Sequence, residues 1–218
     1  MSEVILNEDT HTYTVDGVEL PSATTILRFI RADLGTVNPS VLAMAAERGK
    51  AVHAACEMID YGGDPEIIEG TEGYLMAYLR FLRDHRPEWV GIESPVCSPG
   101  RGFAGTIDRW GFMWDGEDPA ITEEPTVLDL KTVGSPTRET YIALCAQTAA
   151  YAYCLGYNEG CRRYGLFLKA NGDYRLFDCE EWEKKNEFSG LEVFAKCYAV
   201  HQQLAEISRH KRSRGGAK

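Results

Sequence analysis

The chain has 218 residues, and its 23 Lys and Arg against 33 Asp and Glu give a formal net charge of −10, which argues against a protein coated with basic surface for nucleic acid. A content of 44% hydrophobic and 26% charged residues is typical of one soluble globular domain with a substantial core. Because we find neither an apolar stretch of membrane-spanning length nor a signal-peptide pattern, we expect a cytoplasmic protein without membrane contact.

The first elements are predicted from apolar periodicity together with turn and cap residues. Residues 11–20 alternate around an Asp16-Gly17 turn signal and predict a hairpin. Ser22 is the expected N-cap of a helix over residues 24–34. Asn38-Pro39 then begins a second helix, which ends at Gly62-Gly63. A third helix is expected over residues 72–86.

From Trp89 onward the sequence has the period of strands. Residues 89–96, 102–114 and 125–133 predict three successive strands. A helix over 138–157, two strands over 161–170 and 173–179, and one or two helices from Glu180 to about His210 complete the chain. This order predicts an α/β or α+β fold with helices covering a central sheet, and no linker divides it.

The charge is unevenly distributed along the chain. Residues 209–218 hold five Lys or Arg and no acid, so residues 1–208 carry 18 bases against 33 acids, a charge of −15. We therefore expect a single domain over residues 1–208 and a basic C-terminal tail over 209–218. The tail is either a solubilising end or an arm that binds a nucleic-acid backbone, and the acidic body suits a site that gathers divalent cations.

The seven cysteines form no CxxC pair and are odd in number. This favours buried, reduced thiols over a zinc site or a complete disulfide framework. An iron–sulfur cluster on Cys145, Cys154 and Cys161 is the weaker alternative, because such sites usually have closely spaced thiolates.

The stretch TVLDLKTV, residues 126–133, carries an acid and a base on one face of a predicted strand. Because side chains alternate, Leu128 and Leu130 face one way and Asp129 and Lys131 the other. An edge strand with a solvated ion pair is one interpretation. A metal site is the other, because an antiparallel partner strand would bring Asp108 close to Asp129, and two repelling carboxylates favour a divalent cation between them.

Two predicted helices carry further polar candidates. His53 follows Gly49 by one helical turn. A glycine inside a helix costs roughly 1 kcal/mol relative to Ala, so its presence needs a reason. The missing side chain would allow a backbone or a phosphate to approach this face of the helix closely. Gln147 and Tyr151 are also one turn apart, in a largely apolar helix. The structural alternatives are ordinary packing for His53 and a backbone hydrogen bond for Gln147.

Together these motifs resemble the RecB-like branch of the PD-(D/E)XK nuclease superfamily, which includes helicase-associated recombination nucleases, CRISPR adaptation nucleases and phage exonucleases. The pattern of that branch is GxxxH, GxxD, D/E-x-K and QxxxY. It is matched here by Gly49 to His53, Gly105 to Asp108, Asp129 to Lys131 and Gln147 to Tyr151. Each motif alone is weak, but all four in order are strong and cover at least residues 48–151. Residues 11–27 also resemble the start of phage-type exonucleases.

The resemblance implies a restriction-endonuclease-like core, a mixed central β-sheet flanked by helices, preceded here by the N-terminal hairpin and helices. It assigns Mg²⁺ or Mn²⁺ to His53, Asp108, Asp129 and the backbone carbonyl of Leu130. Lys131 would orient and activate the attacking water, so that Asp108, Asp129 and Lys131 are the catalytic residues. Gln147 and Tyr151 would support the site and the DNA backbone. Glu93, on the first strand of the sheet, is a supporting candidate that no motif fixes. The grouped C-terminal cysteines of cluster-bearing members are missing, so no iron–sulfur cluster is expected.

The implied function is a metal-dependent deoxyribonuclease, with an exonuclease of phage or bacterial recombination or repair as the leading interpretation. DNA is the expected partner, and a recombination protein such as a single-strand annealing protein is a further one. A structure-specific endonuclease and a non-catalytic, nuclease-derived DNA-binding subunit are the alternatives, together with chance motifs in an unrelated α/β protein. Besides the tail, Arg48, Lys50 and Arg109 are expected to contact phosphates.

Overall fold

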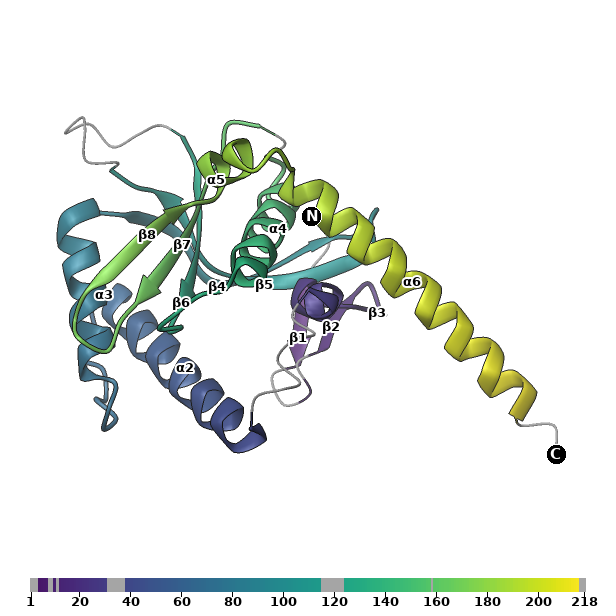
Figure 1. The fold of residues 1–218 in the computed structure, drawn as a ribbon, viewed down its shortest axis with the longest axis horizontal. Coiled ribbons are helices and arrows are strands. Elements are labelled where there is room, and N and C mark those ends of the chain that lie inside the picture. The colour runs from purple at the N-terminus through teal and green to yellow at the C-terminus, as the bar shows by residue number, and fades with distance from the viewer. Residues whose placement is uncertain are drawn as a thin grey trace.

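The computed structural model describes residues 4–7, 10, 12–30, 38–114, 124–157 and 159–215, with side chains up to residue 210. Two sheets and the helices around them make up this part of the chain (Figure 1). The small sheet has the strands β1 (Val4–Asn7), β2 (Thr12–Val15) and β3 (Val18–Leu20) in that order, all antiparallel. The predicted hairpin is confirmed as β2 and β3, whereas the pairing of β1 with β2 was not anticipated by any local signal.

Cap residues begin the first two helices as predicted. Ser22 precedes α1 (Ala23–Ile26), and its Oγ accepts a hydrogen bond of 3.0 Å from the backbone N–H of Thr25. A 3₁₀ turn, Leu27–Phe29, follows, and the remainder of the helix predicted over 24–34 lies mostly outside the described residues. Asn38 caps α2 (Pro39–Asp60) through a 2.9 Å bond from the Ser40 N–H.

The main sheet contains five strands in sequential order: β4 (Glu88–Ser98), β5 (Phe103–Phe112), β6 (Thr126–Lys131), β7 (Arg162–Leu168) and β8 (Tyr174–Asp178). Neighbouring strands are antiparallel except for β6 and β7, which are parallel and are connected through α4 (Arg138–Cys154). A parallel pair needs such a crossover because the chain must return to the same end of the sheet. This mixed sheet confirms the α/β class expected for a PD-(D/E)XK-like core.

Helices cover both faces of the main sheet. On one face α2 and α3 (Glu72–His85) pack through Val52, Tyr78 and Phe81 in a cluster that includes Leu128 and Leu130. On the other face α4 packs in two clusters, one of which contains Val127. The predicted alternation of side chains along β6 is therefore confirmed.

The position of β6 rejects the edge-strand interpretation of TVLDLKTV. It is the third of the five strands, and all of its residues before Lys131 are buried. A charged pair on a central strand needs specific partners, because an unpaired buried charge is strongly unfavourable. Asp129 and Lys131 therefore belong to an organised site and not to a solvated face.

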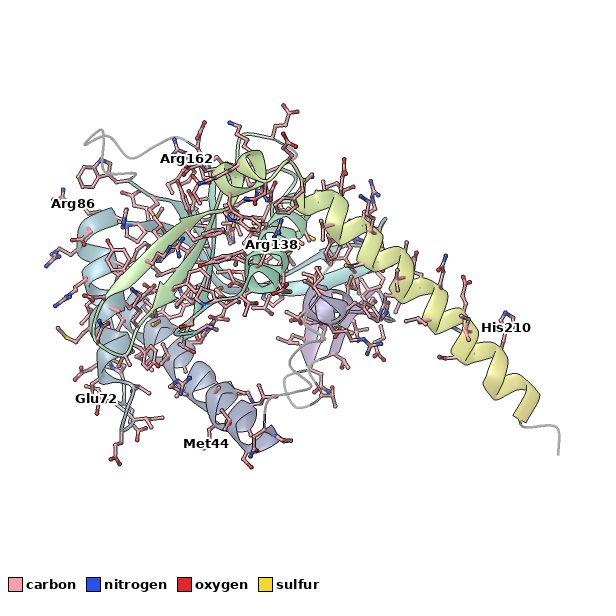
Figure 2. All side chains as sticks on the ribbon, viewed as in Figure 1. Met44, Glu72, Arg86, Arg138, Arg162 and His210 are labelled. Carbon is pink, nitrogen blue, oxygen red and sulfur yellow. The ribbon has the colours of Figure 1, made fainter. Side chains whose placement is uncertain are left out.

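The chain ends in α5 (Cys179–Lys185) and α6 (Gly190–Gly215). The first half of α6 packs against α4 and α1, and the second half projects away from both sheets (Figure 1). His210 lies on this projecting part (Figure 2). The helix continues five residues past His210, where the prediction ended it, into the basic segment. Within the described ranges no helix is both long and apolar enough to cross a membrane.

Candidate active site

A cavity of about 640 Å³ lies between α2, α4, the small sheet and the strands β4 to β6. All six side chains predicted for the site line it: His53, Asp108, Asp129, Lys131, Gln147 and Tyr151. They come from α2, β5, β6 and α4, so that segments far apart in the sequence meet at one place. Gly49, Lys50 and Glu93 are also part of the wall.

The pairing of β5 with β6 positions Asp108. Arg109 lies opposite Leu128 in this antiparallel ladder, so the preceding residue of β5 comes beside the following residue of β6. The Asp108 Oδ2 accepts a 2.6 Å hydrogen bond from the backbone N–H of Leu130. The expected approach of the two acidic strands is present, and Asp108 is fixed by the backbone of the next strand.

His53 reaches from α2 to the same point. Its Nε2 lies 3.2 Å from the Leu130 carbonyl oxygen, and its Nδ1 lies 3.8 Å from Asp108 Oδ2 and 3.5 Å from Glu93 Oε1. Burial alone would lower the pKa of His53, but the carboxylates of Asp108 and Glu93 raise it to about 9. At neutral pH the ring is therefore protonated and donates toward oxygen atoms that could also bind a cation.

Glu93 is the site residue for which no motif gave a role. One ligand atom from each of His53, Glu93 and Asp108 falls within 4.8 Å of the others. Glu93 lies opposite Asp108, between the pairs Ile92 with Arg109 and Ser94 with Ile107. A glutamate inside a strand, two residues after Gly91, is the signal that could have found it, because glycine within a strand often marks an irregularity where a side chain is redirected.

Asp129 lies beside this group and is held by two side chains. It is 2% exposed, its Oδ1 accepts a 2.8 Å bond from Gln147 Nε2, and its Oδ2 forms an ion pair with Lys131 Nζ. Burial raises the pKa of Asp129, and Lys131 acts against this rise. The same Gln147 amide donates to the Tyr151 hydroxyl at 3.4 Å. Gln147 thus orients the Asp129 carboxylate, and its role in supporting catalysis stays a prediction.

Tyr151 remains a neutral hydrogen-bonding group. Burial raises the pKa of its hydroxyl well above 10, and the nearby carboxylates of Asp129 and Asp108 raise it further. A phenol with so high a pKa is a poor nucleophile at neutral pH. Tyr151 can therefore organise the site but not attack a substrate.

Gly49 keeps one wall of the cavity open. A Cβ added at this position would meet only Thr132 Oγ1, at the ordinary contact distance of 3.6 Å. Packing therefore does not require glycine here, although the residue lies in the interior of α2. Glycine leaves free space beside His53. The hypothesis that a backbone or phosphate approaches this face of α2 needs such space.

The expected phosphate-binding bases differ in accessibility. Arg109 is 0% exposed and pairs with acidic groups inside the protein, so its predicted contact with DNA is wrong. Arg48 lies over the ring of Tyr74 at 5.6 Å. Lys50, whose side chain is 79% exposed, does line the cavity. Of these three bases, Lys50 is the one that is both at the cavity and open to solvent.

The donor set fits a hard divalent cation. Carboxylate oxygens and a backbone carbonyl are the ligands that Mg²⁺ and Mn²⁺ prefer, and one imidazole is compatible with Mn²⁺. Several acidic groups also converge here, with protonated His53 among them. A cation in place of the ring proton would offset the negative charge of the same carboxylate oxygens.

No model of a protein family matches the chain, and no curated protein matches it. Two crystal structures of LHK-Exo, an alkaline exonuclease from Laribacter hongkongensis, are similar to it. The complex with dAMP has 16% identity and a TM-score of 0.41, over 91% of this chain and 95% of that chain. The other has 16% identity and a TM-score of 0.40, over 90% and 94%.

Proposed function

We propose that the chain is a deoxyribonuclease that hydrolyses DNA phosphodiester bonds with Mg²⁺ or Mn²⁺, and that it acts as an exonuclease in phage or bacterial recombination or repair. The observation that carries this proposal is one cavity in which His53, Asp108 and Glu93 lie beside the ion pair of Asp129 and Lys131. Acidic cation ligands with an adjacent ammonium are groups that can promote phosphodiester hydrolysis, by activating water and by stabilising the charge of the transition state.

The ligands would be His53, Asp108, Asp129 and the Leu130 carbonyl, and the geometry adds Glu93. When bound, the cation would lower the pKa of a water molecule and offset the negative charge of the phosphate. His53 has to lose its ring proton to bind. The hydrogen bond from the Leu130 N–H would hold Asp108 in place as a ligand.

Lys131 would act on the reacting phosphate itself. Its ammonium lies next to Asp129 at the cavity wall, where it can orient a water molecule and stabilise the charge that grows on the phosphoryl oxygens. Gln147 fixes Asp129, and Asp129 in turn fixes Lys131. The buried carboxylate would therefore hold the ammonium beside the proposed reacting phosphate.

DNA is the proposed partner, and Lys50 is the exposed base at the cavity that would contact its backbone. A recombination protein such as a single-strand annealing protein is proposed as a second partner, on the resemblance of the motifs alone. A structure-specific endonuclease with the same site is the second candidate, because the chemistry of the cavity is the same for internal and terminal bonds.

The test is digestion of end-labelled linear duplex DNA together with a closed circle, in Mg²⁺, Mn²⁺ or EDTA. We expect the linear DNA to be degraded in either metal, with the circle intact and no cleavage in EDTA. Cleavage of the circle would select the endonuclease instead. If both DNAs survive in both metals, the proposed activity is wrong.

Variants separate the roles within the site. Lys131→Ala should bind metal and DNA but cut about 10²-fold more slowly in single-turnover reactions, since it loses charge stabilisation in the transition state. Asp108→Asn should lose metal binding while its amide oxygen still accepts the Leu130 N–H. Asp173→Asn, at the exposed turn between β7 and β8, is the control and should retain full activity. A wild-type rate for Lys131→Ala would remove Lys131 from the mechanism.

A further inference from the structure

A buried ion network lies directly behind the candidate ligands, and the proposed chemistry does not use it. Arg109 of β5 is 0% exposed, and the side chain of Asp60 at the end of α2 is 1% exposed. The Arg109 Nε donates to Asp60 Oδ2 at 2.5 Å. Buried charges are costly unless they are paired and hydrogen-bonded, so such a network needs a reason to exist.

Asp60 is held in turn by α3. The hydroxyl of Tyr78 donates to the two carboxylate oxygens of Asp60, at 2.8 and 2.7 Å. Both Tyr78 and Phe81 are fully buried in the cluster between the helices and the main sheet. The guanidinium of Arg109 is therefore anchored on one side by groups that solvent does not reach.

On its other side Arg109 reaches the cavity through Glu93. Its Nη1 donates to Glu93 Oε1 at 3.0 Å and to the carbonyl oxygen of Asp108 at 2.6 Å. Glu93 is the carboxylate partner of Arg109 that lines the cavity, and the same Oε1 lies 3.5 Å from His53 Nδ1. One oxygen atom thus connects the buried network with the candidate ligand group.

The backbone at Glu93 is unusual and needs support. Glu93 has a φ of +41°, in the left-handed region that residues other than glycine rarely adopt. The pairing of β4 with β5 is also irregular between Trp89 and Gly91. Such a conformation persists where surrounding contacts determine it, and it often occurs at functional sites. The hydrogen bond from Arg109 is one contact that holds this side chain.

We propose that Arg109 is a positioning residue of the metal site: anchored by Asp60 and Tyr78, it holds the Glu93 carboxylate beside His53 and Asp108. This inference rests on the proposed function, because Glu93 acts as a ligand only if the cavity binds a divalent cation. The planar guanidinium is suited to the task, since it donates in two directions from one rigid group. A lysine ammonium keeps the charge but cannot reproduce this geometry.

The experiment measures Mn²⁺ binding to the metal-free protein by titration calorimetry. It compares wild type, Arg109→Lys, Glu93→Gln and the double variant. Each single variant should bind Mn²⁺ about 10- to 100-fold more weakly, the range found when groups that orient ligands are replaced. If Arg109 acts through Glu93, the double variant should bind no more weakly than Glu93→Gln alone.

Arg163→Lys is the matched control. Arg163 is also largely buried, and it forms a two-pronged ion pair with Glu183 at 2.8 and 3.1 Å, but it does not line the cavity. Its replacement should lower the midpoint of thermal unfolding and leave Mn²⁺ affinity unchanged. A general loss of stability is thereby distinguished from a loss of ligand positioning.

If Arg109→Lys fails to fold, Tyr78→Phe takes its place, because it removes only the hydroxyl that holds Asp60. It should weaken Mn²⁺ binding less, and the loss should likewise disappear in the Glu93→Gln background. The positioning role is overturned if the folded Arg109→Lys or Tyr78→Phe protein binds Mn²⁺ with wild-type affinity. It is also overturned if the losses of affinity add up when either change is combined with Glu93→Gln. A wild-type protein that binds no Mn²⁺ and cuts no DNA overturns the proposed function as well, whereas wild-type cleavage with additive losses overturns this inference alone.

Discussion

Gly105 of β5 lies against the ring of Tyr151 in α4, so closely that a side chain on Gly105 would collide with it. A Cβ at Gly105 would come within 2.6 Å of Tyr151 Cε1 and 2.9 Å of its hydroxyl oxygen. This contact joins two of the sequence motifs, the one that begins with Gly105 and the one that ends with Tyr151. It gives a physical reason for glycine at the first of these positions.

The first prediction follows from this contact. Gly105→Ala should destabilise the protein by about 1–3 kcal/mol, the usual cost of overpacking a buried region, and should displace Tyr151 and with it Gln147. Gly100→Ala is the control, because an added Cβ there meets nothing within 4 Å. Urea unfolding of the two variants provides the measurement. Equal midpoints would show that the contact relaxes without cost.

Gly49 leads to the opposite expectation for stability. Gly49→Ala should stabilise α2 by about 0.5–1 kcal/mol, since alanine is favoured over glycine inside a helix and the space is open. The added methyl group enters the cavity, so DNA cleavage should fall while the midpoint of unfolding rises. Gly73→Ala in α3 is the contrast, because its Cβ would collide with the backbone of Ala170. A more stable variant with full activity would show that substrate does not use this face.

Local signals in the sequence predict the elements well, and they predict the motif residues that meet in the cavity. Caps such as Ser22 and Asn38 act within a few residues of the chain, so their effect can be read directly. The alternation along β6 identified Asp129 and Lys131 as a pair on one face. The order of the motifs along the chain predicts that Asp108, Asp129 and Gln147 lie on two strands of one sheet and on the helix that follows them.

The roles of Arg109 and Glu93 could not be predicted in the same way. An arginine next to Asp108 has the sequence pattern of a phosphate contact, but its partner Asp60 lies 49 residues away in α2. Glu93 depends on a left-handed backbone conformation in β4 and on its register with β5. The Arg109–Asp60 pair and the register of β4 with β5 arise from long-range packing, so Gly91 can indicate an irregular strand near Glu93 but not the partners of its side chain.

A third prediction concerns the proton on His53. Because the pKa of His53 in the metal-free protein is raised to about 9, the ring is charged at pH 7.5 and must lose a proton to bind a cation. Mn²⁺ binding should release close to one proton, and affinity should rise with pH between about 6.5 and 8. Calorimetry in buffers of different ionisation enthalpy counts the protons. Release by wild type but not by His53→Gln is expected, and equal release from both would exclude His53.

The same shift has a consequence for stability without metal. A histidine whose pKa is raised from 6.5 to about 9 on folding stabilises the protein fully below pH 6.5 and progressively less as pH rises toward 9. Thermal unfolding in EDTA across this range should therefore show a loss that is smaller in His53→Gln. The variant thus provides the control for other groups that titrate in the same window.

The final prediction concerns how so acidic a protein holds DNA. Residues 1–208 carry a charge of −15, whereas residues 209–218 hold five bases, and α6 brings the start of this segment away from the sheets (Figures 1 and 2). At about 1.5 Å per residue, a helix of 26 residues extends roughly 39 Å, so its end can contact DNA far from the cavity. Removing residues 209–218 should then weaken binding of long duplexes more than binding of short oligonucleotides.

The salt dependence of binding tests this directly. Each lost phosphate contact should reduce the slope of log K against log salt by roughly 0.9 for duplex DNA. DNA affinity is measured across a salt series for three forms of the inactive Asp129→Asn protein. The first has the complete chain, the second lacks residues 209–218, and the third has the five bases of this segment changed to Gln. The Gln variant retains the length of the chain, so a matching drop in both altered proteins would assign the effect to charge. Identical slopes in all three would show that the basic segment does not contact DNA, and that Lys50 and other bases of the body are sufficient.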